Sequence, residues 1–564
     1  MNYSEIYEIW LKSADGDTVE ELKNIDEKEK EERFYKSLDF GTGGLRGIIG
    51  AGTNRMNRYT VMQATQALAN YLNCNGLADK GVCISYDSRL YSDLFAKESA
   101  CVLAANGVKV YLSDALRPVP FLSFSVLNKG AAAGIMITAS HNPPKYNGYK
   151  VYCETGEQIA PEMADEIVSY IKKTDIFNDI KYVDFESCDL IEMMGDETES
   201  LFIENVLLQQ QNPGFAKKAD IGIVYTPLHG SGNIPVRRAL SAAGFEKVYV
   251  VPEQELPDPA FSTVKSPNPE DKEGFYLALD LAKEKDADII IGTDPDCDRV
   301  GVMAKTKDGT FDAFTGNQIG VILLEYLISS KKKNGVLPEN GAVIKTIVTT
   351  YLADRLVESY GLTCMNVLTG FKFIGEKIRQ FEQDGSYTYL FGFEESYGYL
   401  SGTHSRDKDG VVASMLVAEA AAYYKTIGKS LFDVLEEIFD KFGAYTEGLK
   451  SITLEGIEGL EQIKKIMTDL RNNPPSDVSG VKINALEDYK LGVTKFADGR
   501  EEKLTLPKSD VLLFKLEDNS TFAIRPSGTE PKIKIYFGVV DKTSELSKAK
   551  LEKFKAEVER IILG

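Results

Sequence analysis

The segment GIMITASHNPP (residues 134–144) joins a short run of apolar, partly β-branched residues to a loop rich in proline and asparagine. Three other segments repeat this plan, namely ADIGIVYTPLHGSG (219–232), ADIIIGTDPDCDR (287–299) and YTYLFGFEESYG (387–398). Each apolar run has the length of a buried strand, and helical patterns of about 10–15 residues tend to stand between neighbouring runs. The repetition predicts an α/β fold with largely buried sheets, in which the chemistry gathers in the loops beyond the strand ends.

The composition narrows the class of partner. The chain has 564 residues, 65 Lys and Arg against 85 Asp and Glu, and a net charge of −20. This acidity argues against nucleic acid or an anionic membrane surface as the main partner. Seven scattered cysteines without a CxxC motif indicate reduced thiols, and the acidic N-terminus lacks the apolar core of a secretory signal. No apolar run approaches the length of a membrane span, so we expect a cytoplasmic protein.

Several stretches suggest how the chain is organised. Residues 1–40 are charged with a helical period, and Ile6, Trp10 and Leu11 predict an apolar stripe that packs on the first domain. QQQNPG (209–214) is typical of a linker, and the polar stretch 329–341 of a break. The five prolines of residues 251–270 predict a long loop without regular helix.

Ser140 is a candidate nucleophile or phosphate carrier. It stands on a tight loop before Asn142 and two prolines, where backbone N–H groups stabilise negative charge. A plain turn or helix cap explains a lone serine equally well, and no GxSxG motif surrounds it. We include His141 among the catalytic candidates, although direct adjacency is poor geometry for a Ser–His dyad.

Asp294, Asp296 and Asp298 are candidate metal ligands. Carboxylates at positions i, i+2 and i+4 of a loop converge on one cation, and such an all-oxygen set suits Mg²⁺ or Ca²⁺. The residues that follow exclude an EF-hand, because Arg299 replaces its glycine and Lys305 its final glutamate. A solvated acidic turn is the alternative, but three close carboxylates repel one another without a counter-ion.

Two further loops carry groups that suit a phosphorylated sugar. In GFEESYG (392–398), carboxylates and a serine either accept hydrogen bonds from hydroxyls or cap a helix. In RPSGTEPK (525–532), an arginine precedes hydroxyl and backbone donors, although no Walker A motif is present and a plain turn is also possible. The candidates in these two loops are Glu394, Ser396, Arg525, Ser527, Gly528 and Thr529.

Taken together and in order, TASHNPP, DPDCDR, GFEESYG and RPSGTEPK resemble the α-D-phosphohexomutases, and within them the phosphoglucomutase/phosphomannomutase family. GTGGLRG, YDSR, TPLHGSG, PNPE, TGFKFIG and RDKDG support the resemblance, which spans about residues 40 to 540. It implies three related α/β domains with mixed sheets and a smaller α+β C-terminal domain around a central cleft. We place these domains at residues 1–210, 211–325, 326–445 and 446–564.

The resemblance also implies roles for the matched residues. Ser140 would be the phosphoserine, and the three aspartates would bind Mg²⁺ with a phosphate oxygen on Ser140. Glu394 and Ser396 would hold sugar hydroxyls, while Arg525, Ser527, Gly528 and Thr529 would hold the non-reacting phosphate. The remaining basic residues would line the site, with Lys150 a candidate general base: Arg46, Lys150, Arg299, Lys372 and Lys408. One departure is that SYGYL replaces the GxxSGH pattern of some members, so no acid–base histidine is assigned there.

The implied activity interconverts glucose 1-phosphate and glucose 6-phosphate, with glucose 1,6-bisphosphate as intermediate and activator, in a monomer or homodimer. The same mechanism acting on mannose or pentose phosphates stays open. So does a non-catalytic protein that binds sugar phosphates. An aspartyl-phosphate transferase is a weaker alternative: Asp296-Cys297-Asp298-Arg299-Val300 mimics DxDx[TV], but GTDP intervenes between the strand and the first aspartate of that motif.

Overall fold

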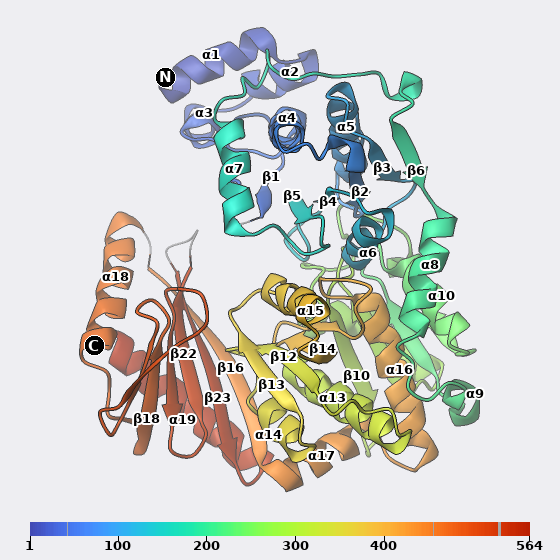
Figure 1. The fold of residues 1–564 in the computed structure, drawn as a ribbon, viewed down its shortest axis with the longest axis vertical. Coiled ribbons are helices and arrows are strands. Elements are labelled where there is room, and N and C mark those ends of the chain that lie inside the picture. The colour runs from blue at the N-terminus through green and yellow to red at the C-terminus, as the bar shows by residue number, and fades with distance from the viewer. Residues whose placement is uncertain (42, 455, 528–531, 564) are drawn as a thin grey trace. The chain divides into compact units, whose positions relative to one another are not determined.

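The computed structural model describes all of the chain except residues 42, 455, 528–531 and 564 (Figure 1). The chain forms two compact units. The first unit comprises Met1–Gly316, Ile374–Gly392 and Ser396–Ser430. The second comprises Asn317–Phe373, Phe393–Glu395 and Leu431–Gly564.

The N-terminal part contains a mixed sheet of six strands in the order β1-β5-β4-β2-β3-β6. Strands β2, β3, β4 and β6 run parallel, whereas β5 pairs with β4 and β1 in antiparallel fashion. Both α5 and α6 pack on β2 and β4. The strands are β1 (Gly44–Ile48), β2 (Val82–Tyr86), β3 (Val110–Ser113), β4 (Ala133–Ile137), β5 (Tyr146–Cys153) and β6 (Ile191–Met194). The helices are α1 (Tyr3–Ser13), α2 (Gly16–Lys23), α3 (Glu27–Phe34), α4 (Arg58–Cys74), α5 (Ser92–Ala105), α6 (Val119–Lys129), α7 (Pro161–Ile171) and α8 (Asp196–Leu207).

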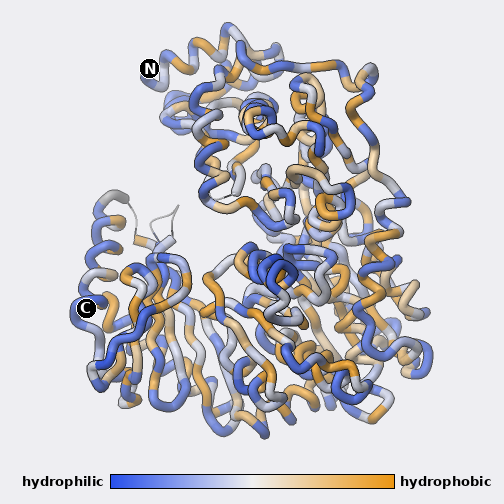
Figure 2. Tube along the Cα trace, viewed as in Figure 1, coloured by the Kyte–Doolittle hydropathy of each residue, from blue (hydrophilic) through white to orange (hydrophobic). Residues whose placement is uncertain are grey.

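The first helices pack through one aromatic cluster. Trp10 of α1 is 1% exposed, and its ring centroid lies 5.7 Å from that of Phe34 and 5.3 Å from that of Phe177. Ile6 and Leu11 are partly buried against the same cluster. The predicted apolar stripe is therefore confirmed, and Figure 2 shows hydrophobic residues interspersed with hydrophilic ones along α1.

A second mixed sheet follows, in the order β11-β10-β9-β7-β8. Strands β7, β8 and β9 are parallel to one another. Strand β10 runs antiparallel to both of its neighbours, β9 and β11. The elements of this part are α9 (Phe215–Ala219), β7 (Ile223–Thr226), α10 (Asn233–Ala242), β8 (Val248–Val250), α11 (Pro252–Glu255), α12 (Tyr276–Glu284), β9 (Ile289–Thr293), β10 (Val300–Lys305) and β11 (Phe311–Ala313).

The prediction for residues 251–270 was wrong in one respect. We expected no regular helix there, but Pro252–Glu255 forms the single turn α11. Proline is tolerated at the first position of a helix because the N–H that it lacks has no intrahelical partner there. The predicted linker 209–214 joins α8 to α9 without helix or strand, while the predicted break at 329–341 begins only after α13 ends at Lys333.

A third sheet has the strand order β13-β12-β14-β15, and β12 pairs with β13 in parallel. The elements of this region are α13 (Gly316–Lys333), β12 (Gly341–Thr346), α14 (Leu352–Ser359), β13 (Thr363–Val367), α15 (Lys372–Asp384), β14 (Thr388–Glu394), β15 (Gly398–Leu400), α16 (Gly410–Thr426) and α17 (Leu431–Phe442).

The C-terminal part is an antiparallel sheet in the order β16-β23-β22-β21-β18-β19-β20, with β17 paired to β18. Apolar side chains of its strands form a core with α18 and α19, including the stacked rings of Phe514 and Phe522. Its elements are β16 (Ala444–Thr453), α18 (Gly456–Asn472), β17 (Asp477–Val478), β18 (Val481–Asp488), β19 (Val493–Phe496), β20 (Glu501–Lys503), β21 (Leu512–Leu516), β22 (Thr521–Pro526), β23 (Lys532–Asp541) and α19 (Ser544–Leu563).

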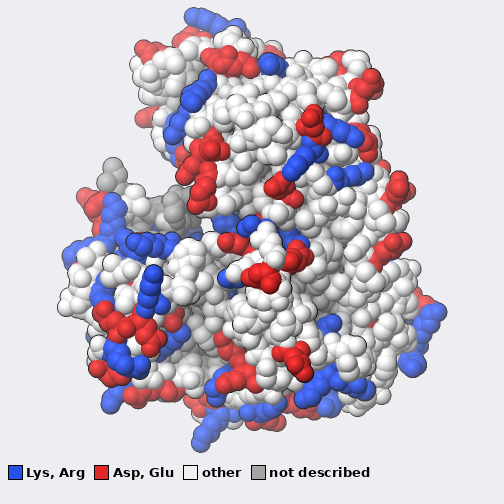
Figure 3. Space-filling view, viewed as in Figure 1, with Lys and Arg blue, Asp and Glu red and all other residues white. Residues whose placement is uncertain are grey.

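Among the described residues, the viewed face of the molecule has no large patch of a single charge sign (Figure 3). Acidic and basic side chains lie interspersed there (Figure 3). In the described part of the chain, no helix is both long enough and apolar enough to cross a bilayer.

Candidate active site

Ser140 lies on the loop that leaves β4, in a strained conformation. Its φ of 52° is in the left-handed region that a β-carbon disfavours, and the residue is 5% exposed. The Ser140 N–H donates to Thr138 Oγ1 at 2.8 Å, and that hydroxyl donates to Asp87 Oδ2 at 2.6 Å. These local hydrogen bonds stabilise a backbone shape that presents the serine hydroxyl at the end of a buried strand.

The buried Arg89 forms hydrogen bonds to the backbone of the same loop. Arg89 donates to the carbonyl oxygens of Pro143 and Tyr146 at 3.1 and 3.0 Å, and also to those of Ser140 and Asn142. The side chains of Arg89 and Asp87 are both fully buried, with Nε 3.3 Å from Oδ2. Burial raises the pKa of Asp87, while Arg89 acts to lower it. In the sequence, Asp87 and Arg89 stand out only as part of the family motif YDSR (86–89), which gives no sign of these hydrogen bonds to the Ser140 loop.

The three aspartates converge where β9 ends. Asp294, Asp296 and Asp298 are at most 2% exposed, and one carboxylate oxygen from each lies within 4.8 Å of those of the others. The backbone N–H groups of Asp298 and Arg299 donate to Asp294 Oδ1, each at 3.1 Å. The intervening Cys297 has a φ of 50°, a second strained position in a predicted site loop. The spacing rule used on the sequence therefore predicted the cluster.

Ser140, the candidate phosphate carrier, contacts the acidic cluster. Ser140 Oγ donates to Asp294 Oδ2 at 2.8 Å, which joins two loops 154 residues apart in the sequence. His141 Nδ1 lies 3.2 Å from the same Oγ. Burial, assisted by the positive charge of Arg299, lowers the pKa of His141 to about 3. The imidazole is thus neutral near pH 7 and is not a source of positive charge for a phosphate.

The acidic cluster fits a divalent cation. Burial raises the pKa of Asp294 well above its usual value, and the neighbouring Asp296 and Asp298 act in the same direction. The Oδ1 atoms of Asp296 and Asp298 are buried, and neither has a hydrogen-bond partner among the described residues. Oxygen-only ligands of this kind are those that Mg²⁺ takes. A bound cation would remove the repulsion and satisfy the orphaned oxygens.

Two lysines already approach the cluster. Lys150 Nζ lies 2.8 Å from Asp296 Oδ2, and Lys408 Nζ lies 3.1 Å from Asp298 Oδ2. Burial tends to raise the pKa of Asp296, but Lys150, a hydrogen bond with Asp294 and the charge of Lys408 together hold that pKa below its usual range. Lys408 also contacts Asp407 at 3.0 Å, and Asp407 accepts a hydrogen bond from Tyr152 at 2.8 Å.

Arg46 enters the site from the adjacent strand. The antiparallel register pairs Gly44 with Lys150 and Arg46 with Gly148, so Arg46 and Lys150 are diagonal neighbours on one face of the sheet. Gly44 makes this pairing possible, because its φ is 147° and an added β-carbon would collide with the carbonyl of Tyr149. Arg46 is exposed, and the charges acting on its guanidinium are those of Asp296, Asp298 and Arg299.

The other predicted residues of the first unit stand in two loops. Arg299 directly follows the acidic cluster and forms an ion pair with Glu270. Ser396 is half-buried in the loop after β14, and the next residue, Tyr397, has a φ of 64°. Among the described residues, the loops TASHNPP, DPDCDR and GFEESYG thus each contain a non-glycine residue in the left-handed region.

The second unit contains the remaining candidates. Glu394 ends β14 and is 6% exposed. Lys372 begins α15, with Nζ 5.5 Å from the ring centroid of Phe373. Arg525 lies near the end of β22, and the Ser527 N–H donates to Lys532 O at 2.8 Å. Gly528 and Thr529 lie outside the described residues.

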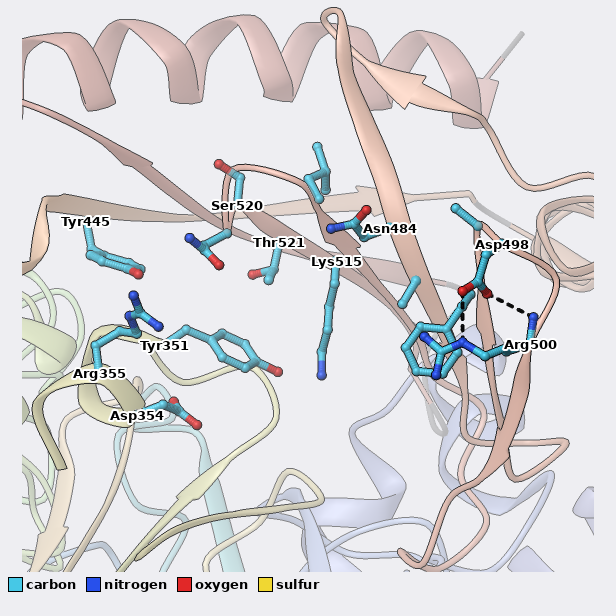
Figure 4. Close-up of a pocket in the computed structure, with 15 residues that line it drawn as sticks. Tyr351, Asp354, Arg355, Tyr445, Asn484, Asp498, Arg500, Lys515, Ser520 and Thr521 are labelled. Carbon is cyan, nitrogen blue, oxygen red and sulfur yellow. Dashed lines mark hydrogen bonds and ion pairs between the residues drawn. The ribbon is translucent and has the colours of Figure 1, made fainter. Parts of the chain in front are cut away.

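The second unit also has a cavity of about 570 Å³ between the start of α14 and the C-terminal sheet (Figure 4). Figure 4 shows Lys515 between the group of Tyr351, Asp354 and Arg355 on one side and the Asp498–Arg500 pair on the other. None of the candidate residues that the structure describes lines this cavity. Its size alone therefore does not mark it as the site of the chemistry.

Family models match most of the chain. Models of phosphoglucomutase/phosphomannomutase alpha/beta/alpha domains I, II and III match residues 37–176, 202–309 and 315–442. The model of the C-terminal domain matches residues 462–560. The four matches follow the domain order of the family.

Individual relatives agree with the domain models. A phosphoglucomutase of Staphylococcus aureus (strain MRSA252) is 38% identical over 535 residues, which cover 94% of each chain. One from Staphylococcus epidermidis is 38% identical over 532 residues, covering 93% of this chain and 95% of its own.

Solved structures show the same fold at lower identity. Parafusin from Paramecium, a phosphoglucomutase solved in an open form, has a TM-score of 0.69 at 17% identity, covering 93% of this chain and 96% of its own. A Burkholderia thailandensis protein of the same family has a TM-score of 0.67 at 18% identity, with coverage of 93% and 98%. Since all four domain models match in order and relatives align along nearly the full length, the chain belongs to the phosphoglucomutase/phosphomannomutase family.

Proposed function

We propose that this protein is a phosphoglucomutase that interconverts glucose 1-phosphate and glucose 6-phosphate. The observation that carries the proposal is the 2.8 Å hydrogen bond between Ser140 Oγ and Asp294 Oδ2, which joins a strained serine to a candidate cation-binding carboxylate cluster. Its relatives from Staphylococcus are named phosphoglucomutases at 38% identity. A phosphoserine beside a divalent cation is the arrangement that reversible phosphoryl transfer to a sugar hydroxyl needs.

In the proposed reaction, Ser140 carries a phosphoryl group. The bond from phosphorus to Ser140 Oγ breaks as a bond forms to the 6-oxygen of glucose 1-phosphate, and the proton of that hydroxyl passes to Lys150 Nζ, the candidate general base. The resulting 1,6-bisphosphate turns around. Its 1-phosphoryl group passes to Ser140 Oγ as the bond from phosphorus to the sugar 1-oxygen breaks, and Lys150 returns the proton to that oxygen. Glucose 6-phosphate is then released, and the serine is phosphorylated again.

Charge neutralisation and water exclusion are the tasks of the surrounding residues. The three aspartates, with a phosphate oxygen on Ser140, would hold Mg²⁺, which when bound neutralises charge on the transferring group. Arg46, Arg299 and Lys408 would supply the fixed positive charge of the protein itself. The burial of Ser140 limits hydrolysis of a phosphoserine by water.

The two orientations of the bisphosphate require a sugar site and a distal phosphate site. We assign sugar hydroxyls to Glu394 and Ser396. We assign the non-reacting phosphate to Arg525, Ser527, Gly528 and Thr529, and substrate binding without a specified contact to Lys372. Glucose is favoured over mannose and pentose because EES in GFEESYG is similar to the sugar loop of glucose enzymes rather than to the GxxSGH form.

We also propose the domain boundaries 1–210, 211–325, 326–445 and 446–564, with catalysis in the cytoplasm by a monomer or homodimer. The ranges of the four family models support four domains, and seven free cysteines suit a reducing compartment. Sedimentation velocity across a concentration series measures the assembly state.

The deciding experiment compares kcat/KM for glucose 1-phosphate, mannose 1-phosphate and ribose 1-phosphate, with Mg²⁺ and a trace of glucose 1,6-bisphosphate. A lead of glucose by tenfold or more, about 1.4 kcal/mol in transition-state free energy, supports the proposal. A lead of mannose or ribose keeps the mechanism and changes the substrate. Ser140→Ala is expected to lose turnover, whereas Ser169→Ala, on the exposed face of α7, retains it.

Two outcomes contradict the proposal. Binding of glucose 6-phosphate without turnover by the phosphorylated protein indicates a non-catalytic binding protein. Turnover that survives Ser140→Ala and is lost in Asp296→Asn indicates an aspartyl-phosphate mechanism.

A further inference from the structure

Glu395, next to the sugar-site candidate Glu394, is held by two buried threonines. Thr346 Oγ1 and Thr349 Oγ1 donate to Glu395 Oε2 at 3.3 and 3.2 Å. The two hydroxyls lie 2.8 Å apart, and the threonines are 0% and 1% exposed. A carboxylate that accepts two buried hydroxyl donors loses much of its rotational freedom.

The threonines belong to a segment that a buried lysine anchors. Lys345, at the end of β12, is 0% exposed, and its Nζ lies 3.0 Å from Asp354 Oδ2 and 2.5 Å from Asn366 Oδ1. The same Nζ donates to Thr349 O at 3.2 Å and lies 4.0 Å from the ring centroid of Tyr351. Asp354 and Tyr351 are in turn part of the cavity wall in Figure 4. The ammonium group therefore fixes the backbone that presents the hydroxyls.

The charge of Glu395 also acts on Tyr536, which neighbours the phosphate-site arginine. Ala523 of β22 pairs with Tyr536 of β23 and Arg525 pairs with Lys534, so Tyr536 and Arg525 are diagonal neighbours on one face of the sheet. Tyr536 of β23 is 9% exposed and packs with Ile347, from the anchored segment, in one apolar cluster. Burial raises the pKa of Tyr536 to about 12; the charge of Glu395 acts in the same direction, and the charge of Arg525 opposes it. The charge of Glu394 also reaches this hydroxyl. The carboxylates of the sugar loop and the guanidinium of Arg525 thus share one neighbour.

We propose that Glu395 is a positioning residue that fixes the sugar loop against the phosphate-binding arginine through Thr346, Thr349 and Tyr536. This role rests on the proposed function, because Glu394 and Arg525 are assigned there to the sugar and to the non-reacting phosphate. A mutase binds two phosphorylated ends in turn, so the separation between its sugar and phosphate contacts must be the same in both half-reactions. A misplacement of about 1 Å is enough to cost a large factor in rate.

The test compares variants that keep or lose the positioning contacts. Thr349→Val removes one hydroxyl donor at nearly constant volume, Thr349→Ser keeps the donor, and Glu395→Gln removes the charge of the acceptor. Glu376→Gln is the matched control, since Glu376 is an exposed glutamate on α15. We expect Thr349→Val and Glu395→Gln to raise KM for glucose 1-phosphate about tenfold, with Thr349→Ser close to wild type. The Mg²⁺ concentration for half-maximal activity stays unchanged, which a general loss of structure would not allow.

A binding measurement separates this inference from the proposed function. Calorimetry of glucose 6-phosphate on Ser140→Ala, alone and combined with Glu395→Gln or Glu376→Gln, needs no turnover. Binding about tenfold weaker only with Glu395→Gln supports the positioning role, even if the wild type proves inactive and the proposed function fails. Equal affinities, absence of binding to Ser140→Ala, or a Thr349→Ser variant as impaired as Thr349→Val would each overturn the role.

Discussion

Ser140 and Asp294 are joined by a hydrogen bond of 2.8 Å although they belong to two different sheets of the first unit. Both follow directly on buried strands, β4 and β9, whose ends present polar groups. Because Asp294 also accepts the N–H groups of Asp298 and Arg299, the serine is tied to the geometry of the whole acidic loop. Substitutions in that loop are therefore expected to shift the position of the Ser140 hydroxyl.

Removal of divalent cations should abolish activity and lower stability. The three buried carboxylates repel one another, so a cation that binds only the folded protein stabilises it, by about 2.7 kcal/mol at one hundred times its dissociation constant. Chelation with EDTA should therefore lower the thermal midpoint, and Mg²⁺ should restore both midpoint and turnover. The measurement is thermal denaturation and mutase activity along a Mg²⁺ titration.

Asp296→Asn should greatly reduce this response to Mg²⁺. Asp308→Asn, which changes an aspartate of an exposed turn, should leave it intact. An unchanged Mg²⁺ shift in Asp296→Asn would remove the acidic cluster from the metal assignment.

Arg89→Met should strongly destabilise the protein. The substitution leaves Asp87 buried without its ion-pair partner and frees four backbone carbonyl groups of the Ser140 loop. Loss of one partner of a buried ion pair costs about 3–5 kcal/mol. Urea denaturation measures this cost. The control Arg500→Met alters an exposed pair with Asp498 and should change the unfolding midpoint little. Similar midpoints for the two variants would mean that the clamp does not stabilise the fold.

Tyr152→Phe should lower kcat by about three- to tenfold while costing only about 1 kcal/mol of stability, the usual value for one hydrogen bond. The hydroxyl orients Asp407, which holds Lys408 beside Asp298. Tyr149→Phe is the matched control, because it also removes a fully buried tyrosine hydroxyl, one that accepts from Thr65 at 3.1 Å. Steady-state kinetics of both variants decide the point. Equal kcat values would show that only packing matters at Tyr152.

The sequence predicted those parts of the site that local spacing encodes. Asp294, Asp296 and Asp298 converge because alternate residues of one loop share a direction, and the tight turn at Ser140 follows from its prolines and asparagine. Arg89 could not be found in this way, since its acceptors are carbonyl oxygens more than 50 residues away, which any residue type carries. Thr346 and Thr349 stand in an ordinary strand end, and only the packing of the second unit gives their hydroxyls a partner.

Glu325→Gln should change how stability depends on pH. Glu325 of α13 accepts a hydrogen bond from Tyr360 at 2.8 Å, and burial raises the pKa of its carboxyl. The folded protein therefore binds a proton at pH values where the unfolded chain, with a pKa of about 4.3, has released it. Stability from this group is fully present below the unfolded value and is lost as the pH rises through the raised value. Glutamine keeps the acceptor and does not titrate. Urea denaturation should thus show that the free energy of unfolding falls more between pH 5 and pH 8 for the wild type than for Glu325→Gln. Equal decreases in the two proteins would contradict the raised pKa.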